Sequence, residues 1–139
     1  MPRKGFSLVE LSVVVIIIGV LAAFGVPRLL KSVERSKAAE AFKYCASVHA
    51  AQERYLACEG TYLVDLTQLD MTLVAPKYFT VGTVAAGATT DLEDSWTLTL
   101  TRAGAASGYG AYTVTFTQDG FDTANSTITG MPDINPMGS

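Results

Sequence analysis

The chain begins with a long apolar run that is interrupted once. From Phe6 to Val26 the sequence carries one charged residue, Glu10, and residues 11–26 carry none. Such a run matches the roughly 20 residues that a helix needs to cross a bilayer. β-Branched residues dominate positions 13–18, but in lipid the backbone must satisfy its own hydrogen bonds, which favours a helix. We therefore predict a membrane-spanning helical segment over residues 6–27.

A helical pattern continues beyond this run. Apolar residues at spacings of three, four or eight form a stripe: Leu30, Val33, Ala41, Tyr44, Val48, Ala51 and Tyr55. Most charged residues are expected off it: Arg28, Lys31, Glu34, Arg35, Glu40, Glu53 and Arg54. No Gly or Pro lies between residues 28 and 57, and Gly60 is a typical stop signal. Residues 28–58 should therefore form the amphipathic half of one helix of about 50 residues, or ~75 Å.

Three residues weaken the first half of this helix: Gly19, Gly25 and Pro27. Pro27 has no amide hydrogen to give to the carbonyl of Ala23, so a kink is expected there. Small residues also let helices approach closely in lipid, and both interpretations can hold.

The remaining segment, residues 59–139, reads as a globular head built on strands. Residues 95–101 alternate, with Trp96, Leu98 and Leu100 on one face and threonines on the other, and residues 112–117 repeat the pattern. A long flexible hairpin loop, residues 102–111, should join them. Weaker strands are expected within residues 74–84 and 121–129, with a loop at 85–94 and an irregular tail. The fold class is therefore α+β, with a long N-terminal helix packed against a small antiparallel sheet.

Charge is distributed unevenly along the chain. Residues 1–60 carry eight Lys and Arg against five acids, whereas residues 61–139 carry two against eight. An acidic head repels a phosphate backbone, so we expect no strong nucleic-acid binding.

Nothing in the sequence indicates catalysis or a cofactor. It has no nucleophile paired with a base, no phosphate-binding loop and no convincing metal cluster. His49 is the only histidine, and we expect a surface or packing role for it. Asp119, Asp122 and Asp133 are weak calcium candidates, because their spacing matches no known motif and solvated acids explain them more simply.

The two cysteines, Cys45 and Cys58, are thirteen residues apart. On one helix their Cα atoms would be about 20 Å apart, whereas a disulfide allows about 7 Å at most. We expect free thiols and no bridge between them, with a bridge to another subunit as the alternative.

The first ten residues carry a recognisable pattern. A short basic leader followed by Gly5-Phe6-Ser7-Leu8-Val9-Glu10 resembles the processing site of the type IV pilin family, which includes the pseudopilins of type II secretion. The resemblance implies that a membrane peptidase cuts between Gly5 and Phe6 and methylates Phe6, so that residues 1–5 are the leader. It also implies that Glu10 pairs with the Phe6 amine of a neighbouring subunit; a pair within one chain is the alternative.

The resemblance, closest over residues 1–60, also implies a function. The chain would be stored in the inner membrane and assembled into a surface pilus through its own N-terminal helices. Its partners would be the prepilin peptidase and methyltransferase, an inner-membrane assembly platform and an ATPase. In the family, a glycine and a proline at these places mark a stretch that loses helicity in the filament. The alternative function is a type II secretion pseudopilin in a periplasmic fibre.

Other interpretations give the N-terminal segment a simpler role. It would be a conventional signal peptide cut near Ala23, releasing a binding domain, or a plain anchor for a sensor or enzyme. Glu10 within the apolar core and the uninterrupted helical pattern argue against the signal peptide. Basic residues after the span would by themselves favour a cytoplasmic head, opposite to the pilin orientation.

Overall fold

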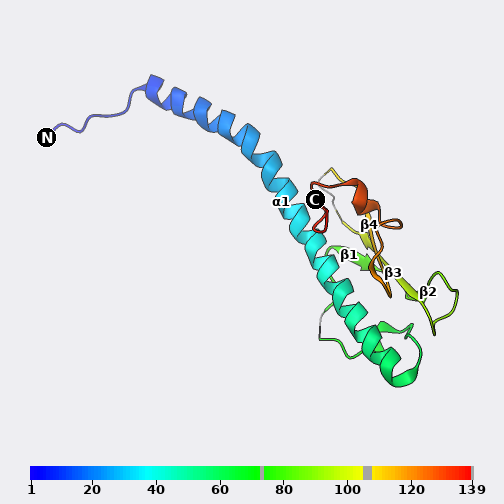
Figure 1. Cartoon of the computed structure of the whole chain (residues 1–139). Helices are drawn as coiled ribbons and strands as arrows, with labels where there is room; N and C mark the ends of the chain where they lie inside the picture. Colours follow the sequence, from blue (N-terminus) through cyan, green and yellow to red (C-terminus); the bar gives the residue numbers. More distant parts are fainter. Residues whose placement is uncertain (73, 105–107, 139) are drawn as a thin grey trace.

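One helix dominates the molecule. The computed structural model describes residues 1–72, 74–104 and 108–138. Helix α1 (Leu8–Glu59) runs unbroken for 52 residues, which corresponds to about 78 Å. Its C-terminal half lies along the head, whereas its N-terminal half projects away from the rest of the chain (Figure 1). The prediction of a single long helix is confirmed.

The C-terminal end of α1 is fixed by a left-handed residue. Gly60 has φ 76°, and its backbone N–H donates to the carbonyl oxygen of Leu56. A residue without Cβ adopts this conformation at little cost and satisfies one of the last free carbonyls of the helix. Gly60 thus ends the helix, as predicted.

The head is a small antiparallel sheet. Its strands are β1 (Phe79–Val81), β2 (Ala85–Ala86), β3 (Trp96–Arg102), β4 (Thr113–Thr117) and β5 (Gly120–Phe121). They are ordered β1-β3-β4-β5, and β2 also pairs with β3. Two short 3₁₀ helices, η1 (Leu66–Gln68) and η2 (Thr127–Gly130), complete the head. The predicted α+β fold class is confirmed.

The two faces of the sheet differ as the alternating pattern predicts. Trp96, Leu98 and Leu100 of β3 are fully buried. The apolar face packs on α1, where the ring of Phe42 lies edge-on to that of Phe116 at 5.8 Å between centroids. On the other face, threonines of β3 and β4 pair directly across the strands: Thr97 with Thr117, Thr99 with Thr115 and Thr101 with Thr113. Such cross-strand pairs stabilise the hairpin.

Two expectations for the head are wrong. Residues 85–94 are not wholly loop, because Ala85 and Ala86 pair with β3. The weak strand expected within residues 121–129 stops at Phe121. Just after it, the Asp122 carboxylate accepts hydrogen bonds from the backbone of Ala124 and Asn125 and turns the chain. The Ser126 side chain then takes the place of a strand partner by accepting from the Thr115 backbone N–H.

The apolar stripe of α1 is buried only where the head covers it. Ala41 and Val48 are fully buried, whereas Leu30 and Val33 remain 46% and 43% exposed. The first buried residue of the helix is Glu34. The part of the long hairpin loop at residues 105–107 lies outside the described residues.

Candidate processing and assembly site

The segment before α1 is extended and open to solvent. Residues 1–7 form no regular structure and are all exposed, with Phe6 at 83%. No heavy atom lies within 4 Å of the place that a Cβ on Gly5 would occupy. The Gly5–Phe6 peptide bond is therefore sterically accessible.

Glu10 closes a capping box at the start of α1. The backbone N–H of Ser7 donates to Glu10 Oε2 at 2.7 Å, and the backbone N–H of Glu10 donates to Ser7 Oγ at 3.2 Å. This reciprocal pair satisfies two amide groups that a helix start leaves free. This capping role was not among the roles expected for Glu10, although Ser followed three residues later by Glu before an apolar run is its sequence signature.

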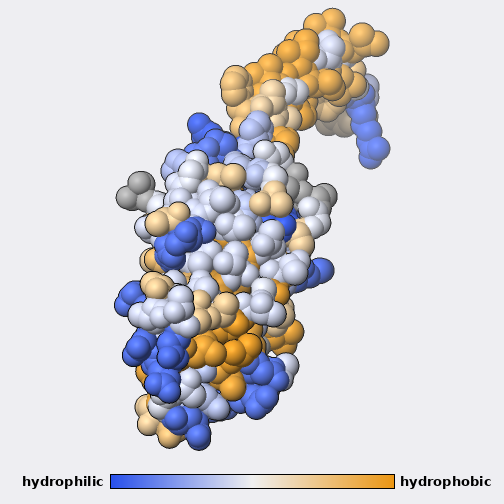
Figure 2. Space-filling model, turned by 90° about the vertical axis from the view of Figure 1, so that its right-hand side faces the viewer, coloured by the Kyte–Doolittle hydropathy of each residue, from blue (hydrophilic) through white to orange (hydrophobic). Residues whose placement is uncertain are grey.

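The first half of α1 is an apolar rod that the head does not cover. All residues from 8 to 33 are exposed. Within the described residues, α1 is the one helix long and apolar enough to cross a membrane, and none of that stretch is buried. Figure 2 shows the rod as an orange projection above a head covered mainly by paler and blue side chains. A surface this apolar requires lipid or another protein.

The three predicted weak points lie in this projecting half. Pro27 is inside α1, and the helix continues through it. Figure 1 shows α1 curving gradually between its free half and its covered half. Gly19 and Gly25 have open space where a side chain would be, so another helix can approach closely there.

A buried charged cluster joins α1 to the sheet just beyond the rod. Glu34 is 0% exposed and Arg102, at the end of β3, is 4% exposed. The Arg102 guanidinium donates to both carboxylate oxygens of Glu34, from Nε at 2.6 Å and from a terminal nitrogen at 3.2 Å. The hydroxyl of Tyr112 donates to Glu34 Oε1 at 2.7 Å, and Lys37 Nζ lies 3.7 Å from Oε2.

These contacts shift the pKa values of the cluster in a consistent direction. Hydrogen bonding from Arg102 lowers the pKa of Glu34 to about 2, against the opposing effect of burial. Hydrogen bonding to Glu34 raises the pKa of Arg102, and burial raises the pKa of Tyr112. Glu34 and Arg102 therefore stay charged and paired at neutral pH.

The expectation that Glu34 lies off the buried face is wrong, and the sequence held a signal for it. Glu34 stands at the head of a second regular row of buried residues on α1: Glu34, Ala38, Ala41, Cys45, Val48 and Gln52. Arg102 likewise continues the alternation of buried residues along β3 after Leu100. A paired charge at matching positions of both elements would have identified the contact.

The other chemically notable residues lie apart from one another. Cys45 is buried in the core, where burial raises its thiol pKa to about 12, and Cys58 is exposed; both thiols are free. The Nε2 of His49 donates to the Gln118 carbonyl oxygen at 2.8 Å, which is a packing role.

The calcium candidates do not form a common site. Asp119 accepts a hydrogen bond from the Gln118 side chain, Asp122 caps its own turn, and Asp133 pairs with Lys31 at 2.8 Å. Within residues 1–72, 74–104 and 108–138, no three His, Cys, Asp or Glu side chains gather as metal ligands would.

Comparison with known proteins points to the N-terminal segment. Residues 1–26 match the family described as the prokaryotic N-terminal methylation motif. The chain is similar to the type IV major pilin protein PilA of Myxococcus xanthus, with 40% identity over 62 residues, covering 44% of this chain and 28% of the relative.

Two further relatives give the same picture. The fimbrial protein EcpC of Eikenella corrodens is 38% identical over 63 residues, covering 45% of this chain and 41% of the relative. The type IV major fimbrial protein FimA of Dichelobacter nodosus is 55% identical over 38 residues, covering 27% and 24%. The chain thus spans less than half the length of these relatives, and no solved structure matches it significantly.

These relatives are pilin and fimbrial proteins, which are structural proteins and not enzymes. This agrees with the expectation that the chain is not an enzyme. The chain carries a prokaryotic N-terminal methylation motif and, over part of its length, is similar to type IV pilins.

Proposed function

We propose that this chain is a structural subunit of a type IV pilus-like filament. It is cut between Gly5 and Phe6 and polymerises through the projecting half of α1. The observation that supports this most directly is the exposed apolar rod, which starts at a capped carboxylate within the methylation motif. Residues 1–5 then act as leader, 6–27 as filament core, 28–58 as the link to the head and 59–139 as the head.

The energetics of this proposal depend on two states of the rod. Before assembly the rod lies in the inner membrane, where lipid covers its apolar side chains. In the filament the rods of neighbouring subunits cover one another, and the acidic heads form the surface. A prepilin peptidase with methyltransferase activity, an inner-membrane platform and an ATPase would carry out processing and extraction.

Cleavage gives Glu10 a second role. It leaves an ammonium group at Phe6, at the positive end of the helix macrodipole. A Glu10 carboxylate at ~4 Å attracts this ammonium by about 4 kcal/mol at an effective dielectric near 20, before desolvation is counted. An ionised acid in lipid is costly without a partner, so a neighbour's Phe6 amine favours entry of each subunit in register.

The first test concerns the mature chain. Purified from membranes or filaments of its native host, it should begin at Phe6 and carry the added mass of one methyl group. A chain that begins at Met1, or near Phe24, would contradict the proposal. Electron microscopy then separates the alternatives, because fibres confined to the periplasm would instead indicate a pseudopilin.

The second test separates the charge of Glu10 from its capping role. Glu10→Gln keeps an acceptor for the Ser7 amide but removes the charge, and we expect at least about tenfold fewer filaments, with normal insertion and cleavage. Ser7→Ala removes the cap partner and keeps the charge, so it should assemble much better. Normal filaments from Glu10→Gln, counted on electron micrographs against membrane-bound subunit, would rule out the charge pair.

A further inference from the structure

The charge asymmetry of the chain is also an asymmetry in space. The last turns of α1 and the head carry many exposed carboxylates: Glu53, Glu59, Asp65, Asp70, Asp91, Glu93, Asp94 and Asp119. Glu53 accepts a hydrogen bond from the hydroxyl of Tyr62, just after the end of α1. The loop of residues 91–94 belongs to this end, because the Tyr62 backbone N–H donates to the Leu92 carbonyl oxygen. Figure 2 shows strongly hydrophilic side chains around the lower end of the head. Burial, and with it the nearby carboxylates of Glu53, Asp119 and Asp94, raises the pKa of Tyr62 to about 12. We call these three carboxylates the acidic end.

The opposite end of the head is basic. Arg28, near the end of the rod, and Arg35, just beyond it, are both exposed, and we call them the basic collar. Lys31 is engaged with Asp133, and Lys37 lies near Glu34. Neither arginine of the collar has an ion-pair partner among the residues that the structure describes. Their charge is therefore available to another molecule.

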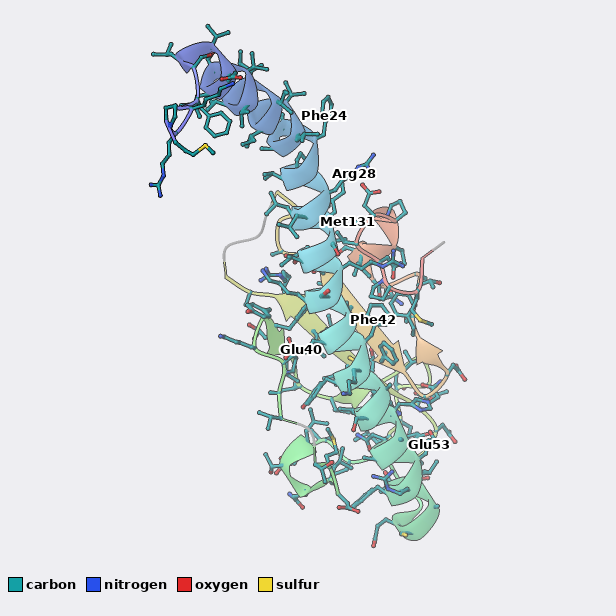
Figure 3. All side chains as sticks on the ribbon, turned by 90° about the vertical axis from the view of Figure 1, so that its left-hand side faces the viewer. Phe24, Arg28, Glu40, Phe42, Glu53 and Met131 are labelled. Carbon is teal, nitrogen blue, oxygen red and sulfur yellow. The ribbon has the colours of Figure 1, made fainter. Side chains whose placement is uncertain are left out.

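Each patch has a residue on the same side of α1. Arg35 and Glu53 are eighteen residues apart, which is five turns, so their side chains leave α1 in the same direction about 27 Å apart. Figure 3 shows Arg28 and Glu53 on the same side of the ribbon and Glu40 on the other. A rigid helix holds these charges well beyond the screening length of ~8–10 Å, so they cannot neutralise each other within one chain.

We propose that the acidic end of one subunit docks on the basic collar of the next. The two copies lie parallel and are offset by about 27 Å along α1. This inference rests on the proposed function, because the shared bundle of rods supplies the parallel orientation. The contact joins two different patches, so it repeats without closing and builds an open fibre. Like ends repel, which disfavours parallel copies that lie side by side without this offset.

Charge reversal tests this contact in the full-length chain. Arg28→Glu with Arg35→Glu reverses the collar, and Asp94→Lys with Asp119→Lys reverses the acidic end. Each pair alone juxtaposes like charges, and we expect at least about a tenfold loss of filaments. The combination of all four should restore most of them. Wild-type filaments should also shorten as salt is raised.

The controls make each outcome decisive. Lys77→Glu changes an exposed charge beside Glu40, on the other side of α1, and should not rescue the reversed acidic end. Membrane fractionation and thermal unfolding in detergent check insertion and folding of every variant. The inference would be overturned if either reversed pair alone formed normal numbers of filaments. It would also be overturned if the combination of all four substitutions did not restore filaments, which is the result expected if the collar binds anionic lipid. Absence of filaments from the wild-type chain would instead count against the proposed function.

Discussion

Glu34 holds the helix and the head together through hydrogen bonds from two buried side chains. It lies on α1 at the point where the exposed rod ends and the covered half begins. Its partners, Arg102 and Tyr112, lie on either side of the loop that joins β3 to β4. A buried ion pair of this kind does not by itself imply high stability, because desolvation offsets much of its attraction. Removal of one partner is costly, however, because the other charge is left buried.

Replacement of Glu34 should therefore destabilise the head strongly. We expect Glu34→Ala to lower the free energy of unfolding by about 3–5 kcal/mol. Lys31→Ala breaks an ion pair with Asp133 whose side chains are half exposed, and should cost about 1 kcal/mol or less. Denaturant unfolding of the detergent-solubilised chain, followed by circular dichroism, measures both. Equal losses of unfolding free energy in the two variants would show that the buried Glu34 pair stabilises the head no more than the exposed Lys31 pair does.

The same residue predicts how stability depends on pH. Its carboxyl pKa falls from a usual 4.5 to about 2 on folding, so the unfolded chain binds the proton more readily between these values. The stabilisation is then fully present above about pH 4.5 and is lost as the pH falls towards 2. The difference in unfolding free energy between wild type and Glu34→Gln should shrink over that range. A difference that stays constant from pH 6 to pH 2 would contradict the assignment.

At the scale of elements, α1 is one helix in two environments. Its first half is exposed, and its second half supplies one wall of the core through residues such as Ala41, Cys45 and Val48. The helix can change environment without breaking because the same backbone hydrogen bonds serve in lipid and in water. Its end is defined locally by Gly60, after which the chain turns into the loop that carries Tyr62 into the core.

Gly60 gives a test of this helix end. A side chain at its φ of 76° is strained, and Gly60→Ala should lower stability by about 1–2 kcal/mol. Gly130→Ala is the matched control, because Gly130 lacks a positive φ and has open space around it. Thermal unfolding should show a lower midpoint for the first variant and little change for the second. An unchanged midpoint for Gly60→Ala would mean that the helix end relaxes freely.

At the scale of the whole molecule, apolar surface and charge are separated along one axis. The rod projects from the head (Figure 1), and Arg28 of the basic collar precedes Glu53 of the acidic end along α1 (Figure 3). The collar and the acidic end give the subunit a direction, which is why the charge-reversal experiment tests assembly and not folding. The threonine face of the sheet is turned away from α1 and remains partly open to solvent.

Local patterns were sufficient for the elements and for the processing motif. Each of these patterns acts over a few neighbouring positions and can therefore be read from the sequence. They are the apolar run, Gly60, the alternation around Trp96 and the residues from Gly5 to Glu10. Short strands were the exception. β2 exists only because β3 offers it a partner, and the end of β5 is set by Asp122 and Ser126, whose side chains compete with strand pairing.

Folding alone decided which charges are buried and which face one another across the molecule. Glu34 and Arg102 are 68 positions apart, and their pairing requires the hairpin to lie on one particular side of α1. The separation of the basic collar from the acidic end likewise depends on the positions of the head's loops in the folded structure. Long-range electrostatics and packing depend on three-dimensional distances, which the order of residues does not specify locally, and they settle these features only once the chain is folded.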